Sequence, residues 1–312
     1  MYTDSKKIKF NSPIYCLGDF LGNNLFIKRE DLIPYCFGGN KARKAYLFFE
    51  EADKYKADCI VTYGSSHSNH CRIVANMCAQ RGIDCFIIAP AEVSDNTFNS
   101  QLMDLFNARI TFVPVSDVSQ AIQSLLSKLE QDRRRPFFIP GGGHGNTGTQ
   151  AFIDCYEEIC SYELMNQIHF DYVFFASGTG TTQAGLIVGK IQKCDKREII
   201  GISIARKNPR GRNIVIDSVC EFLPHIDRKV ADAHTVFIDE YIDKYGQKSQ
   251  EVESAIDGAM IKYGIPLDVT YTGKAFLGMK KYIHQYSVNN KTILFIHTGG
   301  TPLYFDYLES KK

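Results

Sequence analysis

The chain has 312 residues, of which 44% are hydrophobic and 23% are charged, and its formal net charge is +1. This composition is typical of a globular protein with one large domain or two smaller ones. So small a net charge gives no overall field that would attract nucleic acid or an anionic membrane.

The first signal in chain order is a strand followed by a helix. Residues 25–30 alternate well enough for a strand and lead into Gly38-Gly39-Asn40-Lys41. Residues 41–52 combine good helix formers with a helical apolar stripe, so we expect Asn40 to be the N-cap. Lys41 then lies in the first turn, where the helix dipole favours its neutral, nucleophilic form. A basic helix start exposed to solvent is the simpler interpretation of these residues alone.

Strand and helix signals then alternate almost to the end of the chain. We expect strands at residues 59–63, 85–89, 110–115, 137–139, 172–176, 199–204 and 293–296. We expect helices at residues 69–80, 98–107 and 118–129, and a further helix through residues 184–188. Short apolar runs separated by helices indicate parallel sheets covered on both faces. The sequence therefore predicts an α/β fold.

In such folds, ligands bind beyond the carboxyl ends of the strands and near helix N-termini. Five turns are polar or rich in glycine, namely residues 64–70, 141–148, 177–182, 271–274 and 297–300. One such turn can reflect turn chemistry alone. Five of them, together with the Gly-Gly-Asn-Lys stretch, predict one shared ligand cleft.

The turn Ser177-Gly178-Thr179-Gly180-Thr181-Thr182 stands between a predicted strand and a predicted helix. Successive backbone N–H groups and several hydroxyls at a helix start suit an anion, so a phosphate group is the expected ligand. No Gly-Lys-Ser/Thr ends the turn, which excludes a Walker loop. A tight turn with hydroxyl caps is the alternative.

Residues 143–148 match the dinucleotide-binding fingerprint by spacing, but no acid follows about 20 residues later at the end of a strand. A nicotinamide-dependent oxidoreductase therefore remains an alternative of a different class, as does a non-catalytic binding protein. The histidines lack the spacing typical of zinc sites, so no metal is predicted. No Gly-x-Ser-x-Gly elbow supports a hydrolase.

The ten cysteines contain no Cys-x-x-Cys pair, and several lie inside predicted strands and helices, where a free thiol packs as a small apolar group. No apolar stretch approaches the roughly 20 residues of a membrane span, and no apolar run follows the first lysines. We therefore expect reduced thiols, no secretory leader and a cytoplasmic location.

Several motifs stand in order across most of the chain. They are Lys28-Arg29-Glu30-Asp31-Leu32, Gly38-Gly39-Asn40-Lys41-Ala42-Arg43-Lys44, Ser68-Asn69-His70, Tyr271-Thr272-Gly273-Lys274-Ala275 and His297-Thr298-Gly299-Gly300-Thr301-Pro302. Together they resemble the D-cysteine desulfhydrase and 1-aminocyclopropane-1-carboxylate (ACC) deaminase family. Its members are tryptophan-synthase-β-like enzymes of fold type II that depend on pyridoxal 5′-phosphate (PLP).

The resemblance implies a fold and an assembly. Two open, twisted, mostly parallel sheets would form two domains, with the PLP cleft between them. The larger domain would comprise residues 1–46 and 156–312, and the smaller one residues 47–155. A homodimer is also implied, with a small amino acid as substrate.

The resemblance further assigns roles to single residues. Lys41 would bind PLP covalently and carry the substrate proton, and Lys44 would reach the phosphate. The implied cofactor-binding residues are Lys41, Lys44, Asn69, Ser177, Gly178, Thr179, Gly180, Thr181, Thr182, Tyr271, Thr272 and Thr298. The implied substrate-binding residues are His67, Ser68, Asn69, His70 and His144, and the catalytic ones are Lys41, Ser68 and Tyr271.

The chemistry of these roles differs from one residue to the next. Asn69 would bond the 3′ oxygen of PLP, Ser68 and His70 would hold the substrate carboxylate, and Tyr271 would stack on the ring or stand near the reacting carbon. Thr272 stands where the cyclopropane-opening branch typically has glutamate, and a hydroxyl can bond a neutral ring nitrogen. A neutral pyridine ring is a weaker electron sink than a protonated one, but it is adequate when the substrate carries its own leaving group at Cβ.

This argument favours α,β-elimination of D-cysteine to pyruvate, ammonia and sulfide. ACC deamination and β-replacement are the alternatives. His67, where the family usually has glutamine, and His144 both depart from the family pattern beside the expected substrate. These departures leave open a related β-substituted amino acid.

Overall fold

The computed structural model describes residues 10–93, 95–204, 206–241 and 249–312. The larger of two sheets has the strand order β1-β2-β10-β7-β8-β9. Its strands are β1 (Ile14–Phe20), β2 (Asn23–Arg29), β7 (Tyr172–Ser177), β8 (Glu198–Ser203), β9 (Val236–Ile238) and β10 (Thr292–His297). All neighbours pair in parallel except β1 and β2, which form an antiparallel hairpin.

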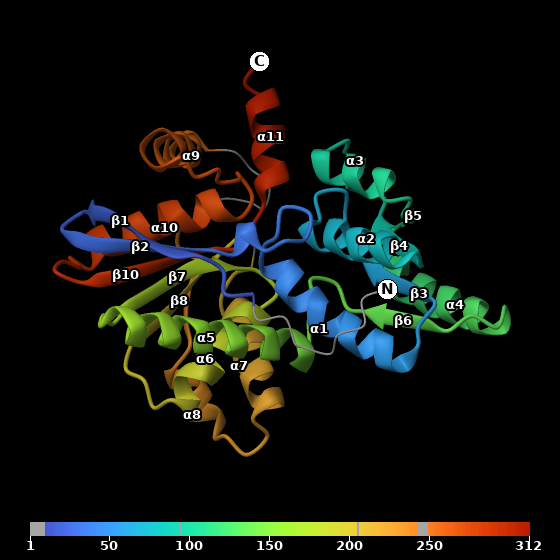
Figure 1. The fold of residues 1–312 in the computed structure, drawn as a ribbon, viewed down its shortest axis with the longest axis horizontal. Coiled ribbons are helices and arrows are strands. Elements are labelled where there is room, and N and C mark those ends of the chain that lie inside the picture. The colour runs from blue at the N-terminus through green and yellow to red at the C-terminus, as the bar shows by residue number, and fades with distance from the viewer. Residues whose placement is uncertain (1–9, 94, 205, 242–248) are drawn as a thin grey trace.

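The smaller sheet has the order β5-β4-β3-β6, and every pair is parallel. Its strands are β3 (Cys59–Tyr63), β4 (Asp84–Pro90), β5 (Arg109–Val113) and β6 (Pro136–Ile139). The prediction of two mostly parallel sheets is therefore confirmed. Figure 1 shows the two sheets in separate halves of the molecule, with α1 (Asn40–Tyr55) running between them.

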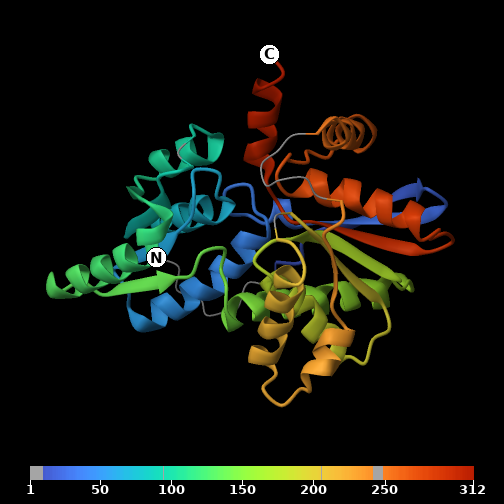
Figure 2. The ribbon, with the colours of Figure 1, turned by 180° about the vertical axis from the view of Figure 1, so that it is seen from behind.

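Helices cover both faces of the larger sheet, as Figures 1 and 2 show from opposite sides. One face carries α9 (Gln250–Tyr263) and α10 (Thr272–Gln285), and the other carries α5 (Asn146–Asn166), α6 (Thr181–Gln192), α7 (Arg210–Phe222) and α8 (Arg228–Ala233). Phe174 and Phe175 are adjacent on β7 and both fully buried, yet they belong to different cores, because side chains alternate across a sheet.

The smaller sheet is also covered on both faces. Its surrounding helices are α2 (Asn69–Arg81), α3 (Phe98–Leu105) and α4 (Val118–Gln131). Ile60 packs in a core with Phe49 of α1 and Ile73 of α2, whereas its neighbour Val61 packs toward Leu129 of α4. The described residues also form α11 (Thr301–Glu309) and two short 3-10 helices, η1 (Glu30–Leu32) and η2 (Val115–Asp117).

Two helices run across the predicted domain boundaries. The boundary at 46/47 falls inside α1, and the boundary at 155/156 falls inside α5. Because each helix is continuous through the boundary, these limits stay a prediction. Within the described ranges, no helix has both the length and the apolar character that a bilayer crossing requires.

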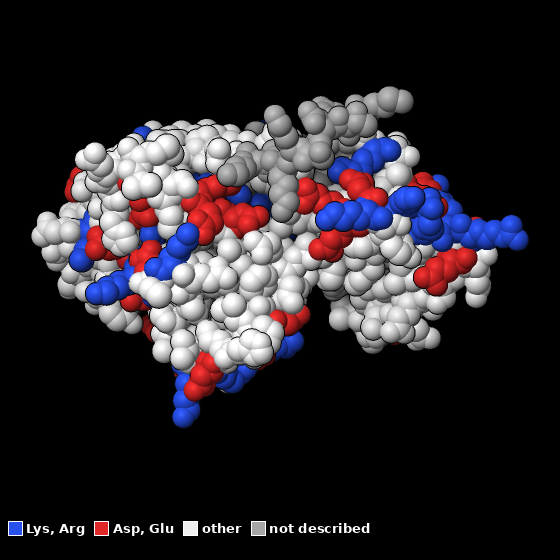
Figure 3. Space-filling model, turned by 60° about the horizontal axis from the view of Figure 1, so that its bottom comes forward, with Lys and Arg blue, Asp and Glu red and all other residues white. Residues whose placement is uncertain are grey.

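Acidic and basic side chains are interspersed on the surface, as Figure 3 shows for one face. This mixture agrees with the net charge of +1. The densest basic run, Arg133-Arg134-Arg135, follows α4, and there Arg134 is paired with Asp58 and Asp84. Arg134 is therefore used in pairing within the protein, whereas Arg133 and Arg135 are exposed.

Candidate active site

A cavity of about 790 Å³ lies between the two sheets. Its wall includes residues at the carboxyl ends of six strands. They are Tyr63 at the end of β3 and Gly64 after it, Pro90 of β4, Pro140 and Gly141 after β6, Gly178 after β7, Arg206 after β8 and Thr298 after β10. This placement is typical of ligand sites in open α/β sheets. It brings residues of both sheets to one cavity.

All five predicted turns contribute to the cavity wall, but not every predicted residue does. The predicted residues that line it are Lys41, Ser68, Asn69, His70, His144, Gly178, Thr179, Tyr271 and Thr298. The predicted residues outside its wall are Lys44, His67, Ser177, Gly180, Thr181, Thr182 and Thr272.

The turn before α1 is fixed by contact between two glycine backbones. Gly39 has a φ of 97°, and a Cβ on it would lie 2.8 Å from the carbonyl oxygen of Thr298. A Cβ on Gly299 would lie 2.7 Å from Cα of Gly39. Only glycine permits this approach. Gly39, not the expected Asn40, is thus the N-cap of α1, and the N–H of Asn40 instead donates to the Thr298 carbonyl over 2.9 Å.

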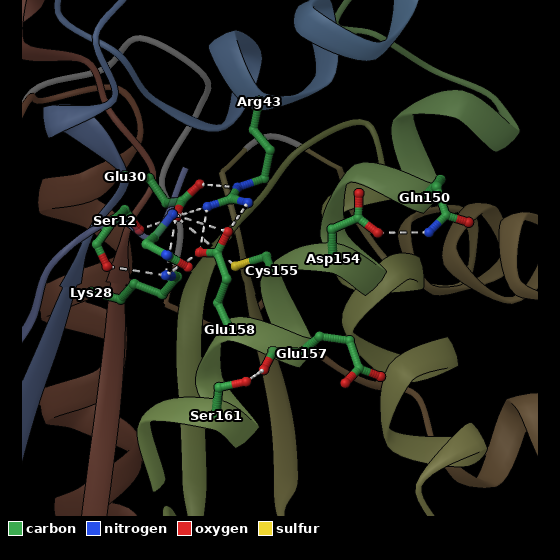
Figure 4. A network of polar contacts seen from close by, with 11 residues as sticks. Ser12, Lys28, Glu30, Arg43, Gln150, Asp154, Cys155, Glu157, Glu158 and Ser161 are labelled. Atoms are coloured by element: carbon green, nitrogen blue, oxygen red, sulfur yellow. Dashed lines mark hydrogen bonds and ion pairs between the residues drawn. The ribbon is translucent and has the colours of Figure 1, made fainter. Parts of the chain in front are cut away.

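Arg43 anchors the first turns of α1 in a buried network of charges (Figure 4). Its guanidinium donates to Glu30 of η1 over 2.6 Å and to Glu158 of α5 over 2.8 Å, and Lys28 contacts Glu158 at 2.8 Å. Burial raises the pKa of Glu30, but Arg43 and Lys28 outweigh that effect and hold it at about 2. The network therefore fixes the helix that carries Lys41.

Lys41 projects from the first turn of α1 into the cavity. Its Nζ lies 3.7 Å from the position that a Cβ on Gly142 would take. Burial, and then the positive charge of Arg206, lower the pKa of Lys41 to about 8. The positive end of the helix dipole acts in the same direction. A nucleophilic amine is therefore available near neutral pH.

Lys44 and the turn after β7 form a cradle for an anion. Lys44 is fully buried, and its ammonium donates to Thr181 Oγ1 over 2.7 Å. Burial and the charge of Lys41 lower the pKa of Lys44 well below its usual value, and no acidic group of the described residues offsets them. Helix α6 begins at Thr181, so its free N–H groups lie beside this ammonium. Both features suit a phosphate.

Asn69 presents its amide in one orientation. Its Oδ1 accepts hydrogen bonds from Arg72 Nη1 at 2.9 Å and from Asn99 Nδ2 at 3.0 Å. These bonds occupy both acceptor positions of Oδ1, so the amide Nδ2 remains as a donor. A donor is what the predicted bond to a cofactor oxygen requires. Arg72 and Asn99 were not among the predicted residues.

Ser68 and His70 belong to the N-terminus of α2. Ser68 is the N-cap, and its Oγ accepts from the N–H of Cys71 at 3.1 Å, which leaves the hydroxyl proton for a ligand. Burial, and then the charges of Lys41 and Lys44, lower the pKa of His70 to about 3. His70 is therefore neutral, and it offers no positive charge to a carboxylate.

Tyr271 and Thr272 begin α10, where the buried carboxylate of Asp268 holds the backbone. Asp268 Oδ1 accepts from the N–H of Tyr271 at 2.7 Å. The hydroxyl of Thr272 donates to Asp268 Oδ2 over 2.7 Å and accepts from the N–H of Asp268 at 2.9 Å. Its proton is used within the protein, so the expected bond from Thr272 to a ring nitrogen gains no support here and stays a prediction.

Two further predicted residues lie outside the cavity wall, and their polar groups contact other side chains of the protein. His67 Nε2 lies 2.9 Å from Asp95 Oδ2, and the hydroxyl of buried Ser177 donates to Gln183 over 2.9 Å. His144 does line the cavity, where burial and then Lys44 lower its pKa. Of the two histidines that depart from the family pattern, only His144 therefore borders the ligand space.

Arg206 and Arg210 are wall residues that the sequence reasoning missed. The guanidinium of Arg206 donates to the carbonyl of Gly178. The other turns were located because ligands in such folds bind beyond the carboxyl ends of the strands. The same rule could have found Arg206, because Arg206 follows β8, which ends at Ser203. The turn lacks the glycines and hydroxyls that marked the others. Over the described residues, no group of three or more His, Cys, Asp or Glu side chains is placed to bind a metal ion.

Comparison with known proteins matches a family described as pyridoxal-phosphate dependent enzymes to residues 11–299. The chain belongs to this family. The predicted resemblance and the predicted cofactor are thereby confirmed. PLP dependence also replaces the nicotinamide alternative that residues 143–148 had left open.

The relatives cover nearly the whole chain. A D-cysteine desulfhydrase of Yersinia enterocolitica is 34% identical over 300 residues, covering 93% of this chain and 91% of the relative. One from Serratia proteamaculans is 33% identical over 310 residues, with the same coverage. A crystal structure of an ACC deaminase homologue gives a TM-score of 0.83 at 26% identity, covering 96% of this chain and 93% of that one.

The residues present fit PLP. The buried ammonium of Lys44 beside the start of α6 suits the phosphate, and the Nδ2 donor of Asn69 suits the 3′ oxygen. Tyr271 supplies an aromatic face at the wall, and Lys41 supplies the amine that binds a carbonyl. Each group would suit a different part of the cofactor.

We expect the reactivity of Lys41 to titrate with a pKa of about 8 and to depend on Arg206. In protein freed of cofactor, the rate of covalent PLP binding should rise through that pH, because only the neutral amine attacks. Arg206→Gln removes a positive charge and should move the midpoint upward, toward the usual 10.5. Absorbance stopped-flow across pH measures the midpoint.

The control is Arg228→Gln, which removes an exposed arginine paired with Asp217. It should leave the midpoint of Lys41 in place. A midpoint that stays fixed or falls in Arg206→Gln would contradict the assigned electrostatic effect.

Proposed function

We propose that the protein is a PLP-dependent lyase that removes a β substituent from a small amino acid. D-cysteine is the favoured substrate, with pyruvate, ammonia and sulfide as products. The proposal rests on one juxtaposition, in which the low-pKa amine of Lys41 and the N-terminus of α2 face the same cavity. The D-cysteine desulfhydrases that are 33–34% identical over most of the chain support this choice of substrate.

Lys41 is the proton carrier in this proposal. PLP, when bound, withdraws electrons from Cα of the substrate and so acidifies its proton. Lys41 Nζ accepts that proton, the Cβ–S bond breaks, and sulfur leaves with its electron pair as hydrosulfide. Water then completes the conversion to pyruvate and ammonia. An amine whose pKa is about 8 accepts a proton and returns it near neutral pH.

The start of α2 would hold the substrate carboxylate. The N–H groups at a helix N-terminus attract an anion, and the Ser68 hydroxyl keeps its proton for donation. Tyr271 stands in the same wall and would cover the reacting carbon. His70 is left for another role, because its ring is neutral.

We also infer a cytoplasmic homodimer. All ten cysteines are free, and both Cys16 and Cys194 are exposed, which suits a reducing compartment. The homodimer follows from the family resemblance. Sedimentation of the purified protein would test it, with a monomer at micromolar concentration as the contradicting result.

The function is tested by a substrate panel. D-cysteine, L-cysteine, β-chloro-D-alanine, D-serine and ACC are each incubated with the PLP-loaded enzyme, and pyruvate and 2-oxobutanoate are quantified. We expect pyruvate and sulfide from D-cysteine, at a rate well above that from L-cysteine. Turnover of ACC alone, giving 2-oxobutanoate, would favour the deaminase reaction instead. That alternative is kept because of the ACC deaminase homologue with a TM-score of 0.83.

A further inference from the structure

The hydrogen bonds around His70 determine which of its nitrogens carries the proton. His70 Nε2 lies 2.9 Å from Thr62 Oγ1, and the Thr62 hydroxyl donates to the carbonyl of Ile139 over 2.7 Å. A hydroxyl has one proton, so Thr62 must accept the bond from His70. His70 therefore carries its proton on Nε2, and Nδ1 presents a lone pair.

Among the described residues, none supplies a hydrogen-bond partner for Nδ1 of His70, although the side chain is only 1% exposed. The residue lines the cavity, whereas its partner Thr62 belongs to β3 and is not part of the wall. Leaving a buried acceptor unsatisfied is unfavourable, because the atom loses its hydrogen bond to water and gains none in return. An unpartnered atom in the wall of a ligand cavity therefore indicates a partner supplied by the ligand.

A lone pair accepts hydrogen bonds and repels other acceptors. The substrate carboxylate has only acceptors, so the side chain of His70 is unsuited to it. The α-amino group is consumed when the substrate joins the cofactor. The remaining donor of a small amino acid is a side-chain thiol or hydroxyl proton.

We infer that His70 is a specificity-determining residue that accepts a hydrogen bond from the side-chain thiol or hydroxyl of the substrate. The inference rests on the proposed function and narrows it. It favours cysteine and serine over substrates whose side chain has no donor, such as β-chloro-D-alanine or ACC. Thr62 is a positioning residue, because its hydroxyl sets the tautomer that makes Nδ1 an acceptor.

The tautomer of His70 can be tested without measuring catalysis. Nitrogen-15 spectra of histidine-labelled protein should show the δ nitrogen of His70 unprotonated and the ε nitrogen protonated, with no change down to about pH 5. Thr62→Val removes the partner of Nε2 and should release this constraint, whereas Thr62→Ser keeps the hydroxyl and should retain it. A wild-type ring protonated on Nδ1 would overturn the inference.

The substrate preference is tested by comparing kcat/KM for a substrate that has a side-chain donor with kcat/KM for one that has none. Thr62→Val and His70→Phe should lower the ratio of kcat/KM for D-serine to that for β-chloro-D-alanine by about three- to tenfold, the effect of one neutral hydrogen bond. Thr62→Ser should restore the ratio. Thr235→Val is the matched control, because this buried hydroxyl also donates to a carbonyl, at 2.7 Å, but lies outside the cavity wall.

A binding measurement separates this inference from the proposed reaction. The dissociation constants of D-serine and D-alanine are obtained from the absorbance change of the PLP-loaded protein. Wild type should prefer D-serine, and His70→Phe should lose that preference. The role of His70 would be overturned if both proteins preferred D-serine equally. It would also be overturned if His70→Phe lowered kcat/KM by the same factor for every substrate. Absence of pyruvate from every substrate would instead overturn the proposed function.

Discussion

Lys41→Ala should abolish elimination, lowering kcat by several orders of magnitude. The substitution removes both the amine that binds the cofactor carbonyl and the group that carries the substrate proton. Some PLP should still bind, because Lys44 and the start of α6 remain. The visible band of lysine-bound cofactor should disappear. Pyruvate formation and absorbance spectra of the dialysed protein measure both effects.

Lys44→Ala is the matched control, since it removes a lysine one turn further along the same helix. Its ammonium contacts Thr181 at the phosphate cradle. We expect weaker PLP binding, with much of the activity recovered at saturating cofactor. Borohydride reduction followed by peptide mapping identifies the modified lysine. Cofactor attached to Lys44, Lys274 or another lysine would contradict the site described here.

Arg43→Met should destabilise the fold by about 3–5 kcal/mol, because it removes the guanidinium that pairs with two buried carboxylates and leaves both of them to Lys28. Glu30 is 0% exposed and Glu158 is largely buried. The free energy of unfolding from urea titration measures the loss. Lys281→Met, which breaks the exposed pair with Glu251, is the control and should change that energy by at most about 1 kcal/mol.

The same network predicts how stability depends on pH. The pKa of Glu30 is about 2 in the folded protein and near 4.5 when unfolded. A depressed carboxyl pKa contributes stability that is complete above the unfolded value and is lost as pH falls toward the folded one. Wild type should thus lose stability between about pH 5 and 2. Arg43→Met should show a smaller loss over that range, and an identical loss would contradict the pairing.

The rule that ligands bind beyond the carboxyl ends of the strands explains how much of the site could be predicted. Turns after β3, β6, β7 and β10 were found because they are rich in glycine and hydroxyls, and each contributes to the cavity. Arg206 was missed because its turn carries no such residues. The cap of α1 was misplaced by one residue, because the close contact between Gly39 and Thr298 depends on the tertiary structure.

The hydrogen-bond partners of the site residues could be predicted less well than the places of these residues in the fold. The residue types at His70 and Thr272 indicated polar contacts, but not the direction of each hydrogen bond. That direction depends on Thr62 and Asp268, which lie behind the wall and carry no motif. The domain limits stay a prediction for a related reason, since α1 packs against elements of both halves.

The place of β10 in the larger sheet has a consequence for how the chain folds. This strand lies between β2 and β7 and is formed by residues 292–297 of a 312-residue chain. The smaller sheet uses only residues 59–139, so its contacts are comparatively local and available early during synthesis. The larger sheet has a gap between β2 and β7 until β10 emerges. Thr298, which contacts the turn before Lys41, directly follows that strand, so the cavity wall is completed only after residues 292–298 have been synthesised, later than the whole smaller sheet.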